Sequence, residues 1–316
     1  GIDALGPIES NQCIEIMTGA PMPEGLDLVV PYEHIEISES VAKIIVEASR
    51  VRMDNVHLKG SDCKAGEVVL GCGHTLNGPH VGIAASMGIL PKLTESSRIL
   101  LISTGDELVD IHETPLDFQI RRSNVHAIKR SLEINGFNNI TLNHLKDDRP
   151  LIESHFIDAT KEYDILIYSG GVSKGKFDYL PSVWNDLGVT KYFHEVAQRP
   201  GKPLWFGKDE SNQTTVVGLP GNPVSSLVCL HRYLIQTRPM FAKLEEEVTF
   251  SKPMTYFLPA TLENKEDGTL WAKPLKIKNS GEFTALANSD GFLELPAETS
   301  CFPRGSAYAF WPWKGL

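Results

Sequence analysis

The fold class is indicated by the stretch Ile99–Leu108, which reads ILLISTGDEL. Its four leading apolar residues are typical of a strand buried on both faces, and the loop that follows carries a glycine and two carboxylates. Similar apolar runs lie at 140–142, 164–168 and 215–217. Helical patterns are found over Val125–Asn135, Leu151–Tyr163 and Tyr179–Leu187, with a longer one from Val224 to about Leu244. This alternation predicts a doubly wound, parallel α/β sheet.

Shorter β patterns lie on both sides of this central domain. From Cys13 to about Lys59, β-branched runs alternate with turn residues, at Leu28–Val30, Ile35–Ile37 and Ala42–Val46. One helix is predicted over Gly78–Met87. After Glu247, short β segments are separated by Gly, Pro and Asn, as in a small barrel or sandwich. We therefore expect a multidomain α/β and β protein.

Composition excludes several classes of protein. The 316 residues are 41% hydrophobic and 22% charged, which is typical of a globular protein of two or three domains. A net charge of -10 argues against a general nucleic-acid surface. No apolar stretch is long enough for a membrane span, so we expect a cytoplasmic chain. The five scattered cysteines suggest neither disulfides nor a zinc site.

Each predicted strand leads into an unusual loop. These loops contain Thr104-Gly105-Asp106-Glu107, Asp147-Asp148, Gly170-Gly171-Val172-Ser173 followed by Asp178, and Pro220-Gly221-Asn222. Loops after parallel strands meet at one edge of the sheet, where ligands bind. Glycines let backbone N–H groups approach a phosphate, and helix starts add partial positive charge. Single loops of this kind are common turns or helix caps, but together they predict an anionic ligand.

The same edge carries charges of both signs. Asp106, Glu107, Asp147, Asp148 and Asp178 repel one another unless a cation is present, and oxygen ligands beside phosphate suit Mg²⁺. Positive groups are supplied by Arg199 and Lys202 in the turn Gln198–Pro203 and by Lys174 and Lys176 in the glycine loop. These cations are expected to bind phosphate or another oxyanion, although solvated surface charges remain the alternative.

Five motifs together resemble one family. They are IMTGAPMPEG (Ile16–Gly25), TGDEL (Thr104–Leu108), GGVS (Gly170–Ser173) closed by Asp178, PGKP (Pro200–Pro203) and LPGNPVS (Leu219–Ser225). Their order and spacing resemble the molybdopterin molybdotransferases, which include the MoeA proteins and the E domain of gephyrin. The resemblance implies four parts: 1–57, most of an inserted β domain; 58–96, a returning piece of the first domain; 97–243, a MogA-like molybdopterin-binding domain; and 244–316, a C-terminal β domain.

The resemblance also implies roles for individual residues. The catalytic acids would be Asp62, Glu107, Asp147 or Asp148, and Asp178, with Glu107 and Asp178 on Mg²⁺. The ligand-binding residues would be Thr104, Gly105, Asp106, Gly170, Gly171, Val172, Ser173, Arg199, Pro200, Gly201, Lys202, Pro220, Gly221, Asn222 and Ser280. Two departures weaken the transfer: Glu195 stands where some relatives have Lys, and no Arg lies near Met254. The family's N-terminal Asp motif has no counterpart here, so one catalytic Asp is expected to be missing.

The implied reaction uses adenylylated molybdopterin and molybdate and releases AMP. The implied assembly is a homodimer in which Asp62 faces the partner's ligand loops, with a possible contact to the molybdopterin adenylyltransferase. Two alternatives stay open. The central domain alone also resembles that adenylyltransferase, and the lack of the family's N-terminal segment is compatible with a non-catalytic binding protein or scaffold.

Overall fold

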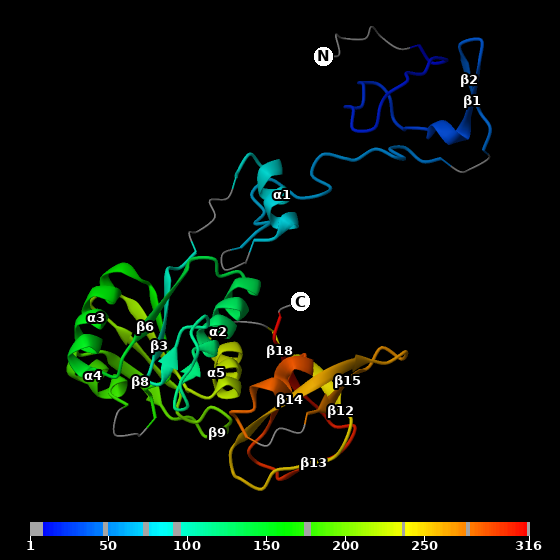
Figure 1. Cartoon of the computed structure of the whole chain (residues 1–316). Helices are drawn as coiled ribbons and strands as arrows, with labels where there is room; N and C mark the ends of the chain where they lie inside the picture. The colour runs from blue at the N-terminus through cyan, green and yellow to red at the C-terminus, as the bar shows by residue number, and fades with distance from the viewer. Residues whose placement is uncertain are drawn as a thin grey trace. The chain divides into compact units, whose positions relative to one another are not determined.

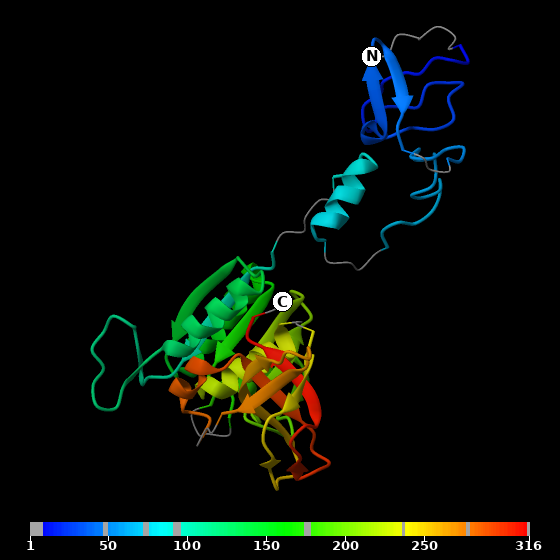
Figure 2. The same cartoon turned by 90° about the vertical axis from the view of Figure 1, so that its right-hand side faces the viewer.

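The computed structural model describes residues 9–46, 50–71, 76–90, 96–173, 178–235, 238–275 and 279–314. Lys174 and Lys176 lie outside these ranges. The chain divides into two compact units, Gly1–Leu93 and Thr94–Leu316 (Figures 1 and 2). In the described part of the chain, no helix combines the length and apolarity that a membrane crossing needs. The division into four parts inferred from the sequence stays a prediction.

The first unit contains little regular structure. A short helix, η1 (Tyr32–His34), leads into the antiparallel hairpin β1 (Ile35–Ser38) and β2 (Val41–Ile44), which confirms two predicted strands. Glu39 and Ser40 both have positive φ, as a two-residue hairpin turn requires. The strand predicted at 28–30 is wrong, because that segment has no strand partner among the described residues. β-branched residues alone do not form a strand when no neighbouring strand is present to pair with them.

The predicted helix near residue 78 is confirmed. It is α1 (Gly78–Ser86), and its N-terminus is fixed by Asn77, whose side chain accepts a hydrogen bond from the His80 amide while the His80 ring accepts one from the Asn77 amide. This reciprocal cap satisfies two N–H groups that the helix itself leaves unpaired. Ala84 is the one buried residue among the described residues of the first unit.

The second unit is built on a six-stranded sheet in the order β6-β3-β7-β11-β10-β8. Its strands are β3 (Ile99–Thr104), β6 (Ile140–Leu145), β7 (Ile165–Ser169), β8 (Thr190–His194), β10 (Trp205–Asp209) and β11 (Thr214–Leu219). The four predicted strands run parallel, as expected. The prediction of a wholly parallel sheet is wrong, since β10 and β8 pair antiparallel beyond β11. Their mixed polar and apolar residues did not mark them as strands.

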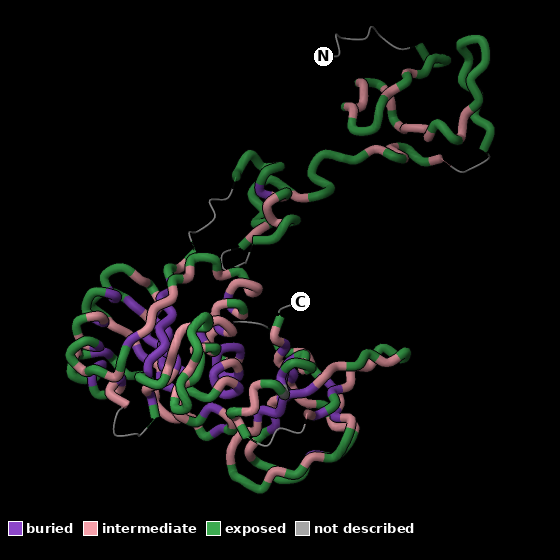
Figure 3. Tube along the Cα trace, in the orientation of Figure 1, coloured by how far each residue is buried: buried purple, intermediate pink, exposed green. Residues whose placement is uncertain are grey.

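Helices bury both faces of this sheet. On one face, α3 (Arg149–Glu162) and α4 (Leu180–Asp186) pack on alternate strand residues, with Trp184 against Trp205 at 4.4 Å between ring centroids. On the other face, α2 (Ser123–Ile134) and α5 (Pro223–Cys229) form a second core. The buried residues form continuous bands through this layered body (Figure 3). Full burial explains why the strands read as unbroken apolar runs.

A five-stranded barrel follows the sheet. It consists of β12 (Met240–Leu244), β14 (Thr255–Asn264), β15 (Leu270–Pro274), β16 (Gly291–Leu295) and β18 (Ala307–Pro312), and the β14–β15 pairing closes it. Short pairs lie outside it: β13 (Val248–Thr249) with β17 (Cys301–Phe302), and β4 (Leu108–Val109) with β5 (Ile120–Arg121). A 3-10 helix, η3 (Phe283–Asn288), completes this part. The predicted small C-terminal β domain is therefore confirmed as a barrel.

Strand pairing attaches the barrel to the sheet domain, in addition to the chain that leads from α5 into the barrel. The short strand β9 (Gln198–Arg199) pairs in parallel with β14 of the barrel.

The helix predicted to reach about residue 244 ends earlier, because α5 continues only as the π-helix η2 (Leu230–Leu234), and residues 240–244 form strand β12. The apolar run satisfied a helical pattern, but its last part is buried in the barrel core instead.

Asp148 has a structural role. Its side chain accepts a hydrogen bond from the Leu151 amide at 2.9 Å and caps α3. Replacement with Ala should lower the free energy of unfolding by about 1 kcal/mol, because an N–H group of the first helical turn loses its partner. Asp148→Ser should restore most of it. Urea denaturation followed by circular dichroism measures both, and equal stability of wild type and Asp148→Ala would show that the cap contributes nothing.

Candidate functional site

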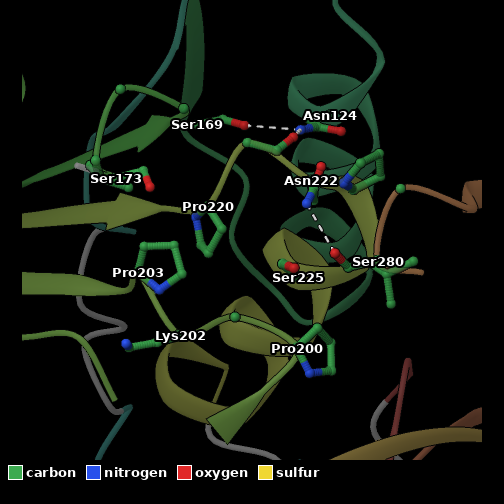
Figure 4. Close-up of a pocket in the computed structure, with 18 of the residues that line it drawn as sticks. Asn124, Ser169, Ser173, Pro200, Lys202, Pro203, Pro220, Asn222, Ser225 and Ser280 are labelled. Atoms are coloured by element: carbon green, nitrogen blue, oxygen red, sulfur yellow. Dashed lines mark hydrogen bonds between the residues drawn. The ribbon is translucent and has the colours of Figure 1, made fainter. Parts of the chain in front are cut away.

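A cavity of about 1030 Å³ opens where β3, β7 and β11 end. One wall comes from the loops of the sheet domain, and the opposite wall comes from β9, from β14 and from the segment 279–281. Figure 4 shows lining residues from both parts, among them Asn222 of the sheet domain, which is hydrogen-bonded to Ser280 of the C-terminal part. The position at the carboxyl ends of the parallel strands is where open α/β sheets bind ligands.

Most of the predicted site residues line this cavity. They are Thr104, Gly105, Glu107, Asp147, Gly170, Gly171, Val172, Ser173, Asp178, Arg199, Pro200, Gly201, Lys202, Pro220, Gly221, Asn222 and Ser280. Two predicted residues of the second unit do not: Asp106 is exposed beside the cavity, and Asp148 caps α3. Asp62 is exposed in the first unit, and its role stays a prediction. The choice between Asp147 and Asp148 therefore falls on Asp147 as the cavity residue.

The glycine loop after β7 is packed tightly against β3. Gly171 has φ +68°, and a Cβ built there would lie 2.9 Å from both the Leu180 Cδ1 and the Thr104 Oγ1 atoms. A side chain at this position would be strained in the backbone and crowded in space. Thr104 is 5% exposed, and its hydroxyl has no hydrogen-bond partner among the described residues. Since buried polar groups are normally paired, this unpaired hydroxyl beside the cavity is an exception.

Two asparagines connect the loops to one another. Asn124, in the first turn of α2, donates to the Ser169 Oγ atom at 3.3 Å and to the Gly221 carbonyl at 2.6 Å. Asn222 donates to the Ser280 Oγ atom at 2.9 Å. Figure 4 marks the bond from Asn124 to Ser169 and the bond from Asn222 to Ser280 with dashed lines. The loops after β7 and β11 and the segment at residue 280 are thus held as one polar surface.

One end of the cavity is acidic. The pKa of Asp147 is raised, first by partial burial and then by the negative charges of Glu107, Asp106 and Asp178, although the Asp106 amide donates to its carboxylate. The carboxylates therefore repel one another in the free protein. Near them, burial and the charge of Arg122 lower the pKa of His144, which keeps that imidazole neutral at pH 7.

This acidic end suits Mg²⁺ only in part. Glu107, Asp147 and Asp178 all supply oxygen atoms, which is the chemistry that Mg²⁺ prefers. Among the described residues, however, no three acidic, His or Cys side chains are arranged to hold an ion by themselves. The donor set fits a cation that takes its remaining ligands from water and from a bound anion.

Basic groups lie in the wall nearer the barrel. Arg199 and Lys202 flank the turn after β9, and Lys252 reaches the cavity from the segment before β14. Burial raises the pKa of Tyr256, and the charge of nearby Arg199 opposes that rise. The Lys202 Nζ atom lies 3.9 Å from the Glu195 carboxylate, so part of its charge is balanced in the free protein. The two or three positive charges of this wall can bind an anion.

Several lining residues were missed from the sequence. Arg121, Arg122 and Asn124 lie at the start of α2, and a basic pair directly before a helix was the signal that could have marked them. Arg122 is paired with Asp110 at this position. Lys252 and Tyr256 come from the barrel, and no sequence pattern places them in the cavity, because only the β9–β14 pairing does so.

Comparison with protein families identifies each part of the chain. Residues 3–88 match the MoeA N-terminal region (domain I and II), residues 100–241 match a probable molybdopterin binding domain, and residues 242–313 match the MoeA C-terminal region (domain IV). A solved MoeA protein of molybdopterin biosynthesis from Pyrococcus horikoshii shares the fold, with a TM-score of 0.72 at 22% identity over 97% of this chain and 78% of that one.

Curated relatives agree over nearly the whole chain. A protein of Synechocystis sp. named molybdopterin molybdenumtransferase is 51% identical over 306 residues, covering 96% of this chain and 78% of the relative. One of the same name from Haemophilus influenzae is 32% identical over 97% of this chain and 78% of its own length. With all three regions matched in order and this identity, the chain belongs to the molybdopterin molybdenumtransferase family, the MoeA proteins.

Proposed function

We propose that this chain is a molybdopterin molybdenumtransferase, in which the cavity binds adenylylated molybdopterin and molybdate, and AMP is released when molybdenum is transferred to the dithiolene. The observation that carries the proposal is the arrangement of a single cavity with glycine loops, an acidic end and a basic wall. Each part suits one component of the substrates. The contribution of β14 and Ser280 to the lining favours this function over adenylylation by the sheet domain alone.

The glycine loops would bind the phosphorylated pterin. Backbone groups of Gly170, Gly171 and Gly221 lie at the wall without side chains that would hold a phosphate away. The unpaired Thr104 hydroxyl and the Ser173 side chain would add hydrogen bonds. Asn124 would keep the two loops at a fixed separation, so that little ordering is required on binding.

Glu107, Asp147 and Asp178 would act at the pyrophosphate. Together with substrate oxygens, Glu107 and Asp178 would hold Mg²⁺, which when bound neutralises the charge that develops on the phosphate oxygens. Burial and neighbouring carboxylates raise the pKa of Asp147, so this carboxylate would exchange a proton with the water or oxyanion that attacks the phosphoanhydride. No covalent nucleophile is needed for this reaction.

The basic wall would hold molybdate. Arg199 and Lys202 would attract the dianion, and Ser280 would donate a hydrogen bond from the C-terminal part. Glu195 beside Lys202 competes for its charge. Lys252 supplies a positive group near Met254, where the expected Arg is absent.

The wider setting is also proposed from the family resemblance. Asp62 would complete the site of a partner subunit in a homodimer, and the protein would work in the cytoplasm, where it could receive the pterin nucleotide from the adenylyltransferase. The reaction is tested by measuring AMP release from adenylylated molybdopterin. We expect release that requires both molybdate and Mg²⁺. A molybdate-independent reaction, or adenylylation of molybdopterin by ATP, would contradict the proposal.

Replacing Asp147 should separate activity from stability. Because its pKa is raised above the ordinary value, the free energy of unfolding falls as pH rises through the interval between those two pKa values. Asp147→Asn should therefore raise the melting temperature of the ligand-free chain at pH 7 by about 1–2 °C, and should not raise it at pH 3, where the carboxyl is protonated. AMP release should fall at least about 100-fold. Full activity in this variant would rule out the role.

Gly221 tests ligand approach without straining the backbone. A Cβ there would meet only the Gly170 Cα atom, at 3.8 Å, whereas Gly171 has no room for one. Gly221→Ala should keep the melting temperature within about 1 °C and weaken binding of adenylylated molybdopterin about 10-fold or more, measured by isothermal titration calorimetry.

The matched control for this change is Gly82→Ala, since Gly82 lies in α1 of the first unit and has open space at its Cβ position. That variant should bind normally. If both variants bound adenylylated molybdopterin like the wild type, the β11 loop would not contact the ligand.

A further inference from the structure

A buried carboxamide supports the turn that carries the two cations. Gln198 is 1% exposed and lies in β9, between the barrel strand β14 and the helix formed by α5 and η2. A buried glutamine costs free energy unless both ends of its amide are hydrogen-bonded. The hydrogen-bond partners of its two ends therefore show which segments Gln198 connects.

The nitrogen end faces the turn. The Gln198 Nε2 atom donates to the carbonyls of Pro200 and Gly201, each at 3.2 Å, and lies 3.4 Å from the Cys229 Sγ atom. The Cys229 thiol in turn donates to the Gly201 carbonyl at 3.6 Å. A single side-chain amide thus donates to the two central carbonyls of the turn, which restricts the backbone between Arg199 and Lys202.

The oxygen end faces the helix. The Gln198 Oε1 atom accepts a short hydrogen bond from the hydroxyl of Tyr233 in η2. Burial raises the pKa of Tyr233 to about 12, so this hydroxyl remains a donor at every working pH. Because Oε1 is occupied by a donor, the amide cannot flip, and its NH₂ group stays directed at the turn.

Close packing reinforces this arrangement. Gly201 has φ +94°, and a Cβ built on it would lie 2.5 Å from the Cys229 Sγ atom and 2.7 Å from the Gln198 Nε2 atom. The turn therefore lies directly on the amide, with no space for a side chain between them. Such a fully satisfied polar network rigidifies its surroundings.

We propose that Gln198 is a positioning residue, which holds the turn 199–202 so that Arg199 and Lys202 face the cavity at the spacing that a tetrahedral oxyanion requires. This inference rests on the proposed function, because it assigns a structural cause to the oxyanion site. Without the amide the turn would keep its charges but not their separation. The defect should therefore appear in oxyanion binding more than in binding at the glycine loops.

The test compares Gln198→Met, which is close in shape and uncharged, with wild type in the full chain. Calorimetric titrations measure the affinity for molybdate and, separately, for adenylylated molybdopterin. We expect molybdate affinity to fall about 10-fold or more, and affinity for the pterin nucleotide to change less than about twofold. Gln213→Met is the control, since Gln213 is bonded in an exposed hairpin away from the cavity.

The double variant Gln198→Met/Tyr233→Phe guards against a folding defect, because it leaves no buried hydroxyl without a partner. It should show the same selective loss, whereas Tyr233→Phe alone should weaken molybdate binding less than Gln198→Met does. Unchanged molybdate affinity in both Gln198 variants, or an equal loss for both ligands, would overturn the positioning role while the proposed function stands. If the wild type bound the pterin nucleotide but no molybdate, the proposed oxyanion wall and this inference would fall together.

Discussion

The constraint on which the rest of the second unit depends is the burial of both faces of the central strands β3, β7 and β11. Because helices cover both faces, charged residues are excluded from these strands and collect in the loops that follow them. In parallel strands those loops all leave at one edge. Every glycine loop, and Asn124 that connects two of them, therefore lies at a single rim.

The barrel closes this rim into a cavity that is basic at one end and acidic at the other. Pairing of β9 with β14 brings Lys252 and Tyr256 opposite the loops, and Arg199 lies on β9 itself. The carboxylates of Glu107, Asp147 and Asp178 remain at the other end. Keeping like charges together lowers stability in the free protein, and binding of the proposed cation and anionic ligand would offset this cost.

Much of this was predictable because the relevant signals are local. Unbroken apolar runs marked β3 and β7, and glycines next to carboxylates marked the loops that supply one wall of the cavity. The antiparallel strands β8 and β10 were not predicted, since their residues form neither an unbroken apolar run nor a regular alternation. Their place is set by pairing, of β10 with β11 and of β8 with β10. The helix predicted to residue 244 failed because barrel burial overrides local periodicity at 240–244. Gln198 was noticed only as the start of a charged turn, since a buried amide cannot be distinguished from a surface one in sequence.

We expect the acidic end to become a cation site only together with the ligand phosphates. Calorimetric titration of Mg²⁺ into the chain, with and without saturating adenylylated molybdopterin, tests this directly. Mg²⁺ should bind at least about 100-fold more tightly with the pterin nucleotide present, because the described carboxylates do not form a complete ion site by themselves. Equal Mg²⁺ affinity in the two titrations would contradict it.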